Sequence, residues 1–110
     1  MYVAVTEHGA YTEVAARGRL NLVGASALQT AVEEALRLGG RRLVINMGGI
    51  DFMDPAGLGS LLCCLKAARE RGGELRISNV TPLVRTVLDL TGTARVLMPD
   101  GTMEHSYAEC

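Results

Sequence analysis

Short apolar segments alternate with one-sided helical segments along this chain, and glycine or proline marks most of the changes. Apolar side chains recur at helical spacing between Ala25 and Leu38, and the pair Gly39-Gly40 ends that helix. Leu43-Val44-Ile45 is an unbroken apolar run, which is typical of a strand covered on both faces. Because strands that alternate with helices are joined by right-handed crossovers, the sequence predicts a largely parallel central sheet.

The remaining segments extend this pattern in both directions. Asp54-Pro55 and Thr81-Pro82 each predict a helix start, because Asp or Thr can cap and proline tolerates the first helical position. The first of these helices is expected to end at Gly72-Gly73 and the second at Gly92, while Gly48-Gly49 is expected to open a loop. Further strands are predicted at residues 2–5, 11–20, 75–77 and 96–98. The predicted fold is α/β, with a mixed, mostly parallel central sheet and the order β-β-α-β-α-β-α-β.

Composition and charge exclude several classes of protein. Leu, Ile, Val and Phe make up about a quarter of the chain, above the level of roughly 20 % that favours disorder. No apolar run approaches the length of a membrane span, and no secretory signal is visible, so a soluble protein is expected. The 11 basic and 12 acidic residues give a net charge of −1, which argues against nucleic-acid binding. The 3 cysteines form no disulfide framework, which favours reduced thiols and a cytoplasmic location.

No catalytic motif is complete in this sequence. Gly57-Leu58-Gly59 resembles the start of a dinucleotide-binding fingerprint, but Leu62 stands where the third glycine belongs. The serine that follows is misplaced for a nucleophile elbow. His8 falls in a predicted turn and His105 in the tail, where solvated imidazoles are expected. The sequence therefore predicts a protein that is not an enzyme.

Two pairs of residues have both a chemical and a structural interpretation. Asp51 and Asp54 could form a carboxylate pair or metal ligands, but the favoured interpretation is a helix cap at Asp54 and a solvated turn at Asp51. Cys63 and Cys64 lie in a predicted helix without other metal-ligand types at suitable spacing. One of them is expected to pack inside as a small apolar side chain. No metal and no cofactor is expected.

The segment from Ile50 to Gly59 is the most informative loop-to-helix junction. A helix N-terminus presents unpaired N–H groups, and Gly57 and Gly59 would let another chain approach closely. Phe52 and Met53 would supply apolar surface beside it. The alternative is that the glycines ease packing of the helix on the sheet and that Phe52 and Met53 belong to the core. The residues alone leave both interpretations open.

The same segment resembles the central motif of the STAS family, the sulphate-transporter and anti-sigma-factor-antagonist domain. Asp54-Pro55-Ala56-Gly57-Leu58-Gly59 matches a family motif that reads Asp-Ser-Ser/Thr-Gly-Leu-Gly. Further similarity lies in Gly18-Arg19-Leu20-Asn21, in the segment 71–75 and in the segment 81–92. The resemblance covers residues 1–98, which implies one STAS domain followed by a C-terminal tail at 99–110.

The resemblance implies a binding module of a bacterial partner-switching system. In the family's antagonists, the first serine of the motif is phosphorylated by a partner that is both anti-sigma factor and kinase. Pro55 and Ala56 occupy the two hydroxyl positions here, and Asn21 replaces a common acidic residue. The expected protein docks on a kinase-like anti-sigma factor or related regulator but is not phosphorylated at this motif. Ser26 and Ser60 are the substitute acceptors considered.

The predicted partner-binding residues lie in and directly after the Asp54 motif and in the segment around Asn21. They are Asn21, Val23, Asp54, Pro55, Ala56, Gly57, Gly59 and Ser60. An alternative function is a regulatory subunit of a membrane lipid or anion transporter, and a third is a small-ligand or nucleotide sensor. Neither nucleic acid nor direct membrane insertion is expected, and association of two copies is left open.

Overall fold

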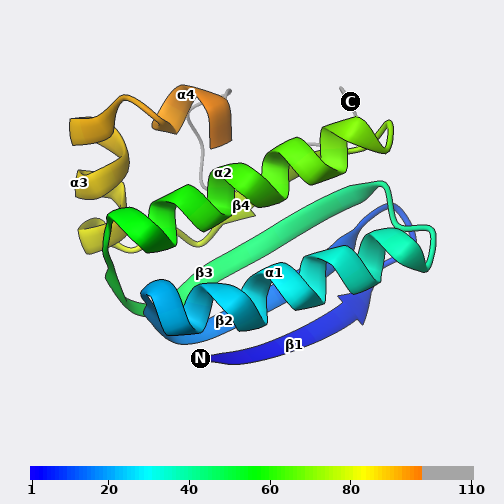
Figure 1. Cartoon of the computed structure of the whole chain (residues 1–110), viewed down its shortest axis with the longest axis horizontal. Helices are drawn as coiled ribbons and strands as arrows, with labels where there is room; N and C mark the ends of the chain where they lie inside the picture. Colours follow the sequence, from blue (N-terminus) through cyan, green and yellow to red (C-terminus); the bar gives the residue numbers. More distant parts are fainter. Residues whose placement is uncertain (98–110) are drawn as a thin grey trace.

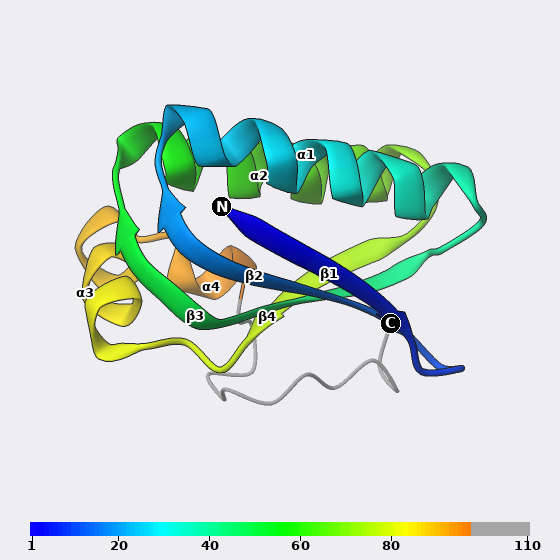
Figure 2. The same ribbon diagram turned by 90° about the horizontal axis from the view of Figure 1, so that it is seen from below.

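The computed structural model describes residues 1–97, in which a four-stranded sheet carries two long helices on one face (Figures 1 and 2). The strands are β1 (Tyr2–Glu7), β2 (Thr12–Leu20), β3 (Arg42–Met53) and β4 (Glu74–Ser78). The helices are α1 (Leu22–Arg37), α2 (Pro55–Glu70), α3 (Pro82–Thr91) and α4 (Ala94–Leu97). The sheet order is β1-β2-β3-β4, with β1 antiparallel to β2 and the other two pairs parallel. The predicted mixed, mostly parallel sheet is confirmed.

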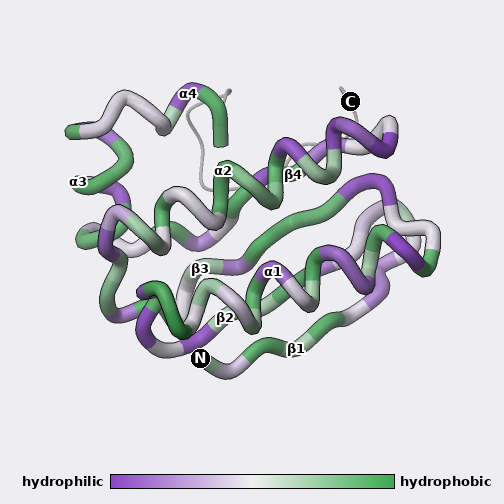
Figure 3. The backbone as a smooth tube through the Cα atoms, in the orientation of Figure 1, coloured by the Kyte–Doolittle hydropathy of each residue, from purple (hydrophilic) through white to green (hydrophobic). Residues whose placement is uncertain are grey.

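The core lies between the sheet and the helices α1 and α2. Leu28 and Val32 of α1 and Leu61 of α2 are fully buried against the strands. Leu43, Val44 and Ile45 are all buried too, so the continuous apolar run of β3 is enclosed as predicted. Figure 3 shows the first half of β3, after its polar start, as a hydrophobic segment that runs between α1 and α2 in this view. Within residues 1–97, none of the helices is long and apolar enough to cross a membrane.

The glycine pair Gly48-Gly49 does not open a loop, so this prediction is wrong. β3 continues through both glycines to Met53 as a 12-residue strand. The pairing of β2 with β3 shifts register between Ala15 and Arg17, as at a β-bulge. A Cβ atom at Gly49 would lie 2.8 Å from Cγ of Arg17. The glycine at position 49 therefore accommodates a close approach inside the sheet. Because β3 continues to Met53, Asp51 lies in an exposed part of this strand and not in the predicted turn.

The predicted last strand is also wrong over its described part. Val96 and Leu97 lie in α4, where their N–H groups donate to the Thr93 carbonyl at 3.1 and 3.3 Å. The side chain of Leu97 is fully buried. A run of three apolar residues is too short for periodicity to distinguish a strand from a helical turn. Met98, the tail at 99–110 and His105 lie outside the described residues.

Candidate functional site

The starts of α1 and α2 lie beside each other because β2 and β3 are parallel neighbours. Leu20, the last residue of β2, pairs with Met53, the last residue of β3. Each strand is followed by one residue and then a helix, so Asn21 and Asp54 reach the same edge of the sheet. The Asp54 N–H donates to the Leu20 carbonyl at 3.3 Å. Both views show the two helix starts at this edge (Figures 1 and 2).

Asn21 and Asp54 cap their helices in the same way. Oδ1 of Asn21 accepts a hydrogen bond from the Gly24 N–H at 2.9 Å. Oδ1 of Asp54 accepts one from the Gly57 N–H at 2.8 Å, which confirms the predicted cap. α1 starts at Leu22, three residues before the start that apolar spacing indicated, because the cap and not the first buried side chain sets the boundary. Asn21 thus has a structural role of its own as the cap of α1.

Gly57 packs α2 against the end of β2. A Cβ atom at this position would lie 1.9 Å from the Leu20 carbonyl oxygen, so only glycine fits. Gly57 is buried, and Oγ of Ser60 donates to its carbonyl at 2.7 Å from a buried position. The expectation that Gly57 and Ser60 form part of an accessible contact surface is therefore corrected. Ser60 is equally unsuited as a phosphate acceptor, because its hydroxyl is enclosed and already engaged.

Gly59 differs from Gly57. No heavy atom lies within 4 Å of a Cβ atom built on Gly59, which is half-buried on α2. A side chain would find open space there, so internal packing gives no reason for a glycine. Gly59 remains a predicted contact position.

The accessible part of the site is apolar. Leu22 and Val23 in the first turn of α1 keep 75 % and 82 % of their surface exposed, and Pro55 and Ala56 in the first turn of α2 are exposed as well. We name these four residues the helix-start surface. The sequence analysis did not identify Leu22 as a site residue, because its exposure depends on how α1 packs on the sheet.

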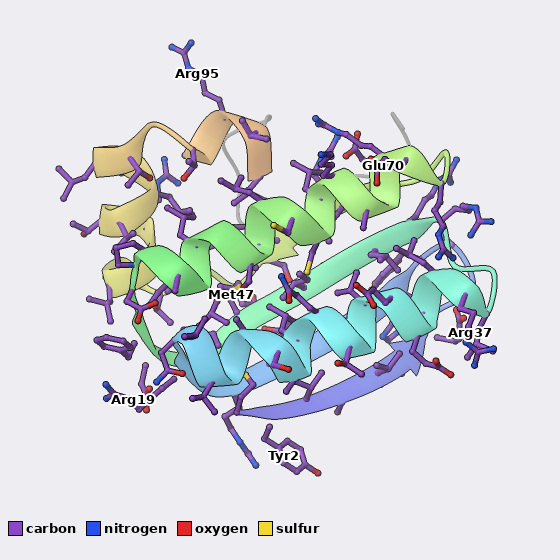
Figure 4. The ribbon with its side chains drawn as sticks, viewed as in Figure 1. Tyr2, Arg19, Arg37, Met47, Glu70 and Arg95 are labelled. Atoms are coloured by element: carbon purple, nitrogen blue, oxygen red, sulfur yellow. The ribbon has the colours of Figure 1, made fainter. Side chains whose placement is uncertain are left out.

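Arg19 and Phe52 border the helix-start surface. The guanidinium of Arg19 lies over the Phe52 ring, 4.1 Å from its centroid. Figure 4 shows the Arg19 side chain at the same end of the molecule as the start of α1. Phe52 is half-buried, whereas Met53 is buried in the core. Of the two interpretations of this pair, core packing therefore applies to Met53, whereas Phe52 keeps apolar surface beside the helix starts.

The adjacent cysteines have different environments. Cys63 is exposed and Cys64 is buried, which confirms that one of the two packs inside. Burial raises the pKa of the Cys64 thiol to about 12, with smaller contributions from Cys63 and Glu33. Within residues 1–97, no group of three His, Cys, Asp or Glu side chains gathers as a metal site would require.

We predict that iodoacetamide at pH 8 alkylates Cys63 of the folded protein much faster than Cys64. Only a thiolate attacks the reagent, and a pKa of about 12 keeps Cys64 protonated until the pH is far higher. Tandem mass spectrometry of the alkylated peptide distinguishes the two sites. In urea both cysteines should react alike, and equal reaction in the folded state would contradict the prediction.

A family model described as "Mlab, STAS domain" matches residues 3–99. The chain belongs to the STAS domain family. This STAS domain is 26 % identical over 98 residues to the anti-sigma F factor antagonist of Paenibacillus polymyxa, covering 88 % of this chain and 84 % of that protein. It is also 26 % identical over 90 residues to the anti-sigma-B factor antagonist of Staphylococcus aureus, covering 82 % and 83 % of the two chains.

Solved structures share the fold of this STAS domain. An anti-sigma factor antagonist from Mycobacterium paratuberculosis superposes with a TM-score of 0.77 at 23 % identity, over 88 % of this chain and 82 % of that one. The unphosphorylated form of the anti-sigma factor antagonist SpoIIAA gives a TM-score of 0.73 at 19 % identity, over 88 % and 86 % of the two chains. The resemblance that the motif indicated is thus confirmed at the level of family and fold.

Proposed function

We propose that this STAS protein is an anti-sigma factor antagonist of a bacterial partner-switching system, acting in the cytoplasm. The names of its relatives support this function over the alternative of a transporter subunit. The observation that carries the proposal is the helix-start surface, where two apolar residues of the family's motif and two of the neighbouring helix α1 are exposed side by side. Exposed apolar side chains gathered at one place are typical of a surface that another protein covers.

The helix-start surface is proposed to dock on a kinase-like anti-sigma factor. Leu22 and Val23 offer the largest exposed apolar side chains of this surface, and Pro55 and Ala56 add a second apolar turn beside them. Gly59, with open space around its Cα, would extend the contact along α2. Asn21 and Asp54 cap the two helix starts, so the helix-start surface is proposed to be preorganised in the free protein.

The contact is proposed to be insensitive to phosphorylation at the motif. Pro55 and Ala56 carry no hydroxyl group, and Ser60 is buried with its Oγ bonded to the Gly57 carbonyl. A phosphate there would add about −1.5 to −2 charges to an apolar surface and oppose docking by desolvation. Without an acceptor, this route of release is absent and the protein would remain binding-competent while ATP is present.

The double variant Pro55→Ser/Ala56→Ser tests the proposal. Incubated with a cognate kinase-like regulator and ATP, the parent protein should form a complex and take up no phosphate. The double variant should gain phosphate at position 55 or 56, because Asp54 and Gly57 still shape the helix start. Mass spectrometry locates the phosphate, and size-exclusion chromatography follows the complex.

An Ala27→Ser variant is the matched control, since it adds one exposed hydroxyl on α1 outside the motif. It should behave like the parent protein. Phosphate on the parent chain, at Ser26 or elsewhere, would refute insensitivity to the kinase. Absence of a complex under every nucleotide condition would refute this class of partner.

A further inference from the structure

β1 is an edge strand whose outer side no other described element covers. Among residues 1–97 it pairs only with β2, and Figure 1 shows it as the outermost strand of the sheet. Tyr2 is 63 % and Val5 50 % exposed, on opposite faces of the strand. Such an edge is a template for pairing with a further strand.

The turn after β1 determines which backbone groups point outward. The His8 N–H donates to the Tyr11 carbonyl at 2.9 Å, so these opposite residues form a hydrogen-bonded pair. Hydrogen-bonded and non-bonded pairs alternate along an antiparallel ladder. With Thr6 opposite Glu13 and Ala4 opposite Ala15, the even-numbered residues bond to β2. The N–H and C=O groups of Val3, Val5 and Glu7 therefore point to the open side.

The usual protection of an edge strand is missing from β1. Proteins commonly guard such edges with proline, lysine or a bulge. β1 has the sequence YVAVTE, with neither proline nor lysine, and its register with β2 is unbroken from Tyr2 to Glu7. Glu7 is its one charged residue and lies at its end. The strand is thus of ordinary length, regular and almost uncharged.

We propose that two copies of this protein pair through their β1 edges, antiparallel about a two-fold axis at Val5. In this register Val5 meets Val5 of the second copy, and Val3 meets Glu7 at both ends, so no like charges oppose each other. The outward groups of three residues from each copy then form about six hydrogen bonds. The two four-stranded sheets join into one continuous sheet.

The flank of α1 next to β1 is compatible with this pairing. Gln29 and Glu33 line a cleft toward α2, so at 100° per residue the opposite flank of α1 carries Val23, Ala27 and Ala31, with Glu34 beside them in an ion pair with Arg37. Ala31 packs half-buried against the core, and Ala27 is exposed. Their small side chains allow the helices of two copies to come close above the joined strands. The hydrogen bonds of this pairing come from β1 and not from the helix-start surface, so the pairing does not rest on the proposed function.

Sedimentation equilibrium of the full chain, from about 5 µM to about 500 µM, covers the affinities expected of a small interface. The molar mass should rise from 11.7 kDa toward twice that value. A Val5→Pro variant should remain monomeric, because it removes an outward N–H on the two-fold axis while leaving the β1–β2 hydrogen bonds intact. A Val5→Asp variant should do the same by placing two carboxylates opposite each other.

A Leu90→Asp variant is the control and should dimerise like the parent, because Leu90 is exposed on α3, which lies at the other side of the sheet from β1 (Figure 1). Circular dichroism establishes that each variant is folded. If Val5→Pro unfolds, Val5→Asp and concentration-dependent protection of the Val3, Val5 and Glu7 amides from hydrogen exchange decide the matter. A parent protein that stays monomeric at about 500 µM, or folded Val5 variants that still dimerise, would overturn the proposal.

Discussion

A Gly57→Ala variant is expected to lose about 3 kcal/mol of unfolding free energy, at the upper end of the cost of overpacking. The added Cβ would lie 1.9 Å from the Leu20 carbonyl oxygen, which is backbone and cannot turn away. Either α2 must move off the end of β2 or the strand must bend. In a domain of this size the melting temperature should fall by roughly 10–20 °C, as measured by circular dichroism or calorimetry.

Gly59→Ala is the matched control on the same helix. Its Cβ would meet no heavy atom within 4 Å, and alanine favours the helical state over glycine by up to about 1 kcal/mol. This variant should therefore be as stable as the parent protein or slightly more so. Equal melting temperatures for the two alanine variants would show that the Gly57 contact does not restrict the packing of α2.

A Leu22→Asp/Val23→Asp variant is expected to bind the kinase-like regulator on the order of 100-fold more weakly, or about 2.7 kcal/mol. Both side chains are largely exposed in the free protein, so their loss should leave its stability nearly unchanged. In a complex, however, two carboxylates would have to be desolvated against an apolar contact. Isothermal titration calorimetry with the regulator measures the change.

Leu38→Asp is the corresponding control. Leu38 is 73 % exposed and follows the C-terminal end of α1, a 16-residue helix about 24 Å long. Its substitution changes charge and apolar area as much per residue but far from the helix-start surface. Undiminished binding by the Leu22/Val23 variant, or equal loss in the Leu38 variant, would exclude the proposed docking surface.

Capping residues in the sequence correctly predicted where α2 and α3 begin and where α3 ends. Asp54-Pro55 and Thr81-Pro82 start helices as predicted, since a cap bonds a backbone N–H only three residues away. Gly92 ends α3 in the left-handed conformation, with φ of 74°. The prediction of a loop at Gly48-Gly49 was wrong, because Gly49 accommodates Arg17 on the neighbouring strand and the pair forms no local turn.

The candidate site was predicted only in part, for the same reason. The motif located the start of α2, whereas the start of α1 was predicted three residues too late, and neither pattern distinguished exposed residues from buried ones. Gly57 and Ser60 were predicted to contact a partner but are buried, whereas Leu22 was not predicted and is exposed. Burial at these positions depends on the pairing of Leu20 with Met53, two residues far apart in the chain.

The sequence by itself determined that position 55 and position 56 cannot accept a phosphoryl group, because that depends only on which atoms the side chains carry. It also determined where α2 and α3 begin, because caps are local. Only the tertiary structure decided which residues of the motif another protein can reach and which edge of the sheet stays open. Those properties arise from strand register and helix packing, which bring distant segments together and which no local pattern records.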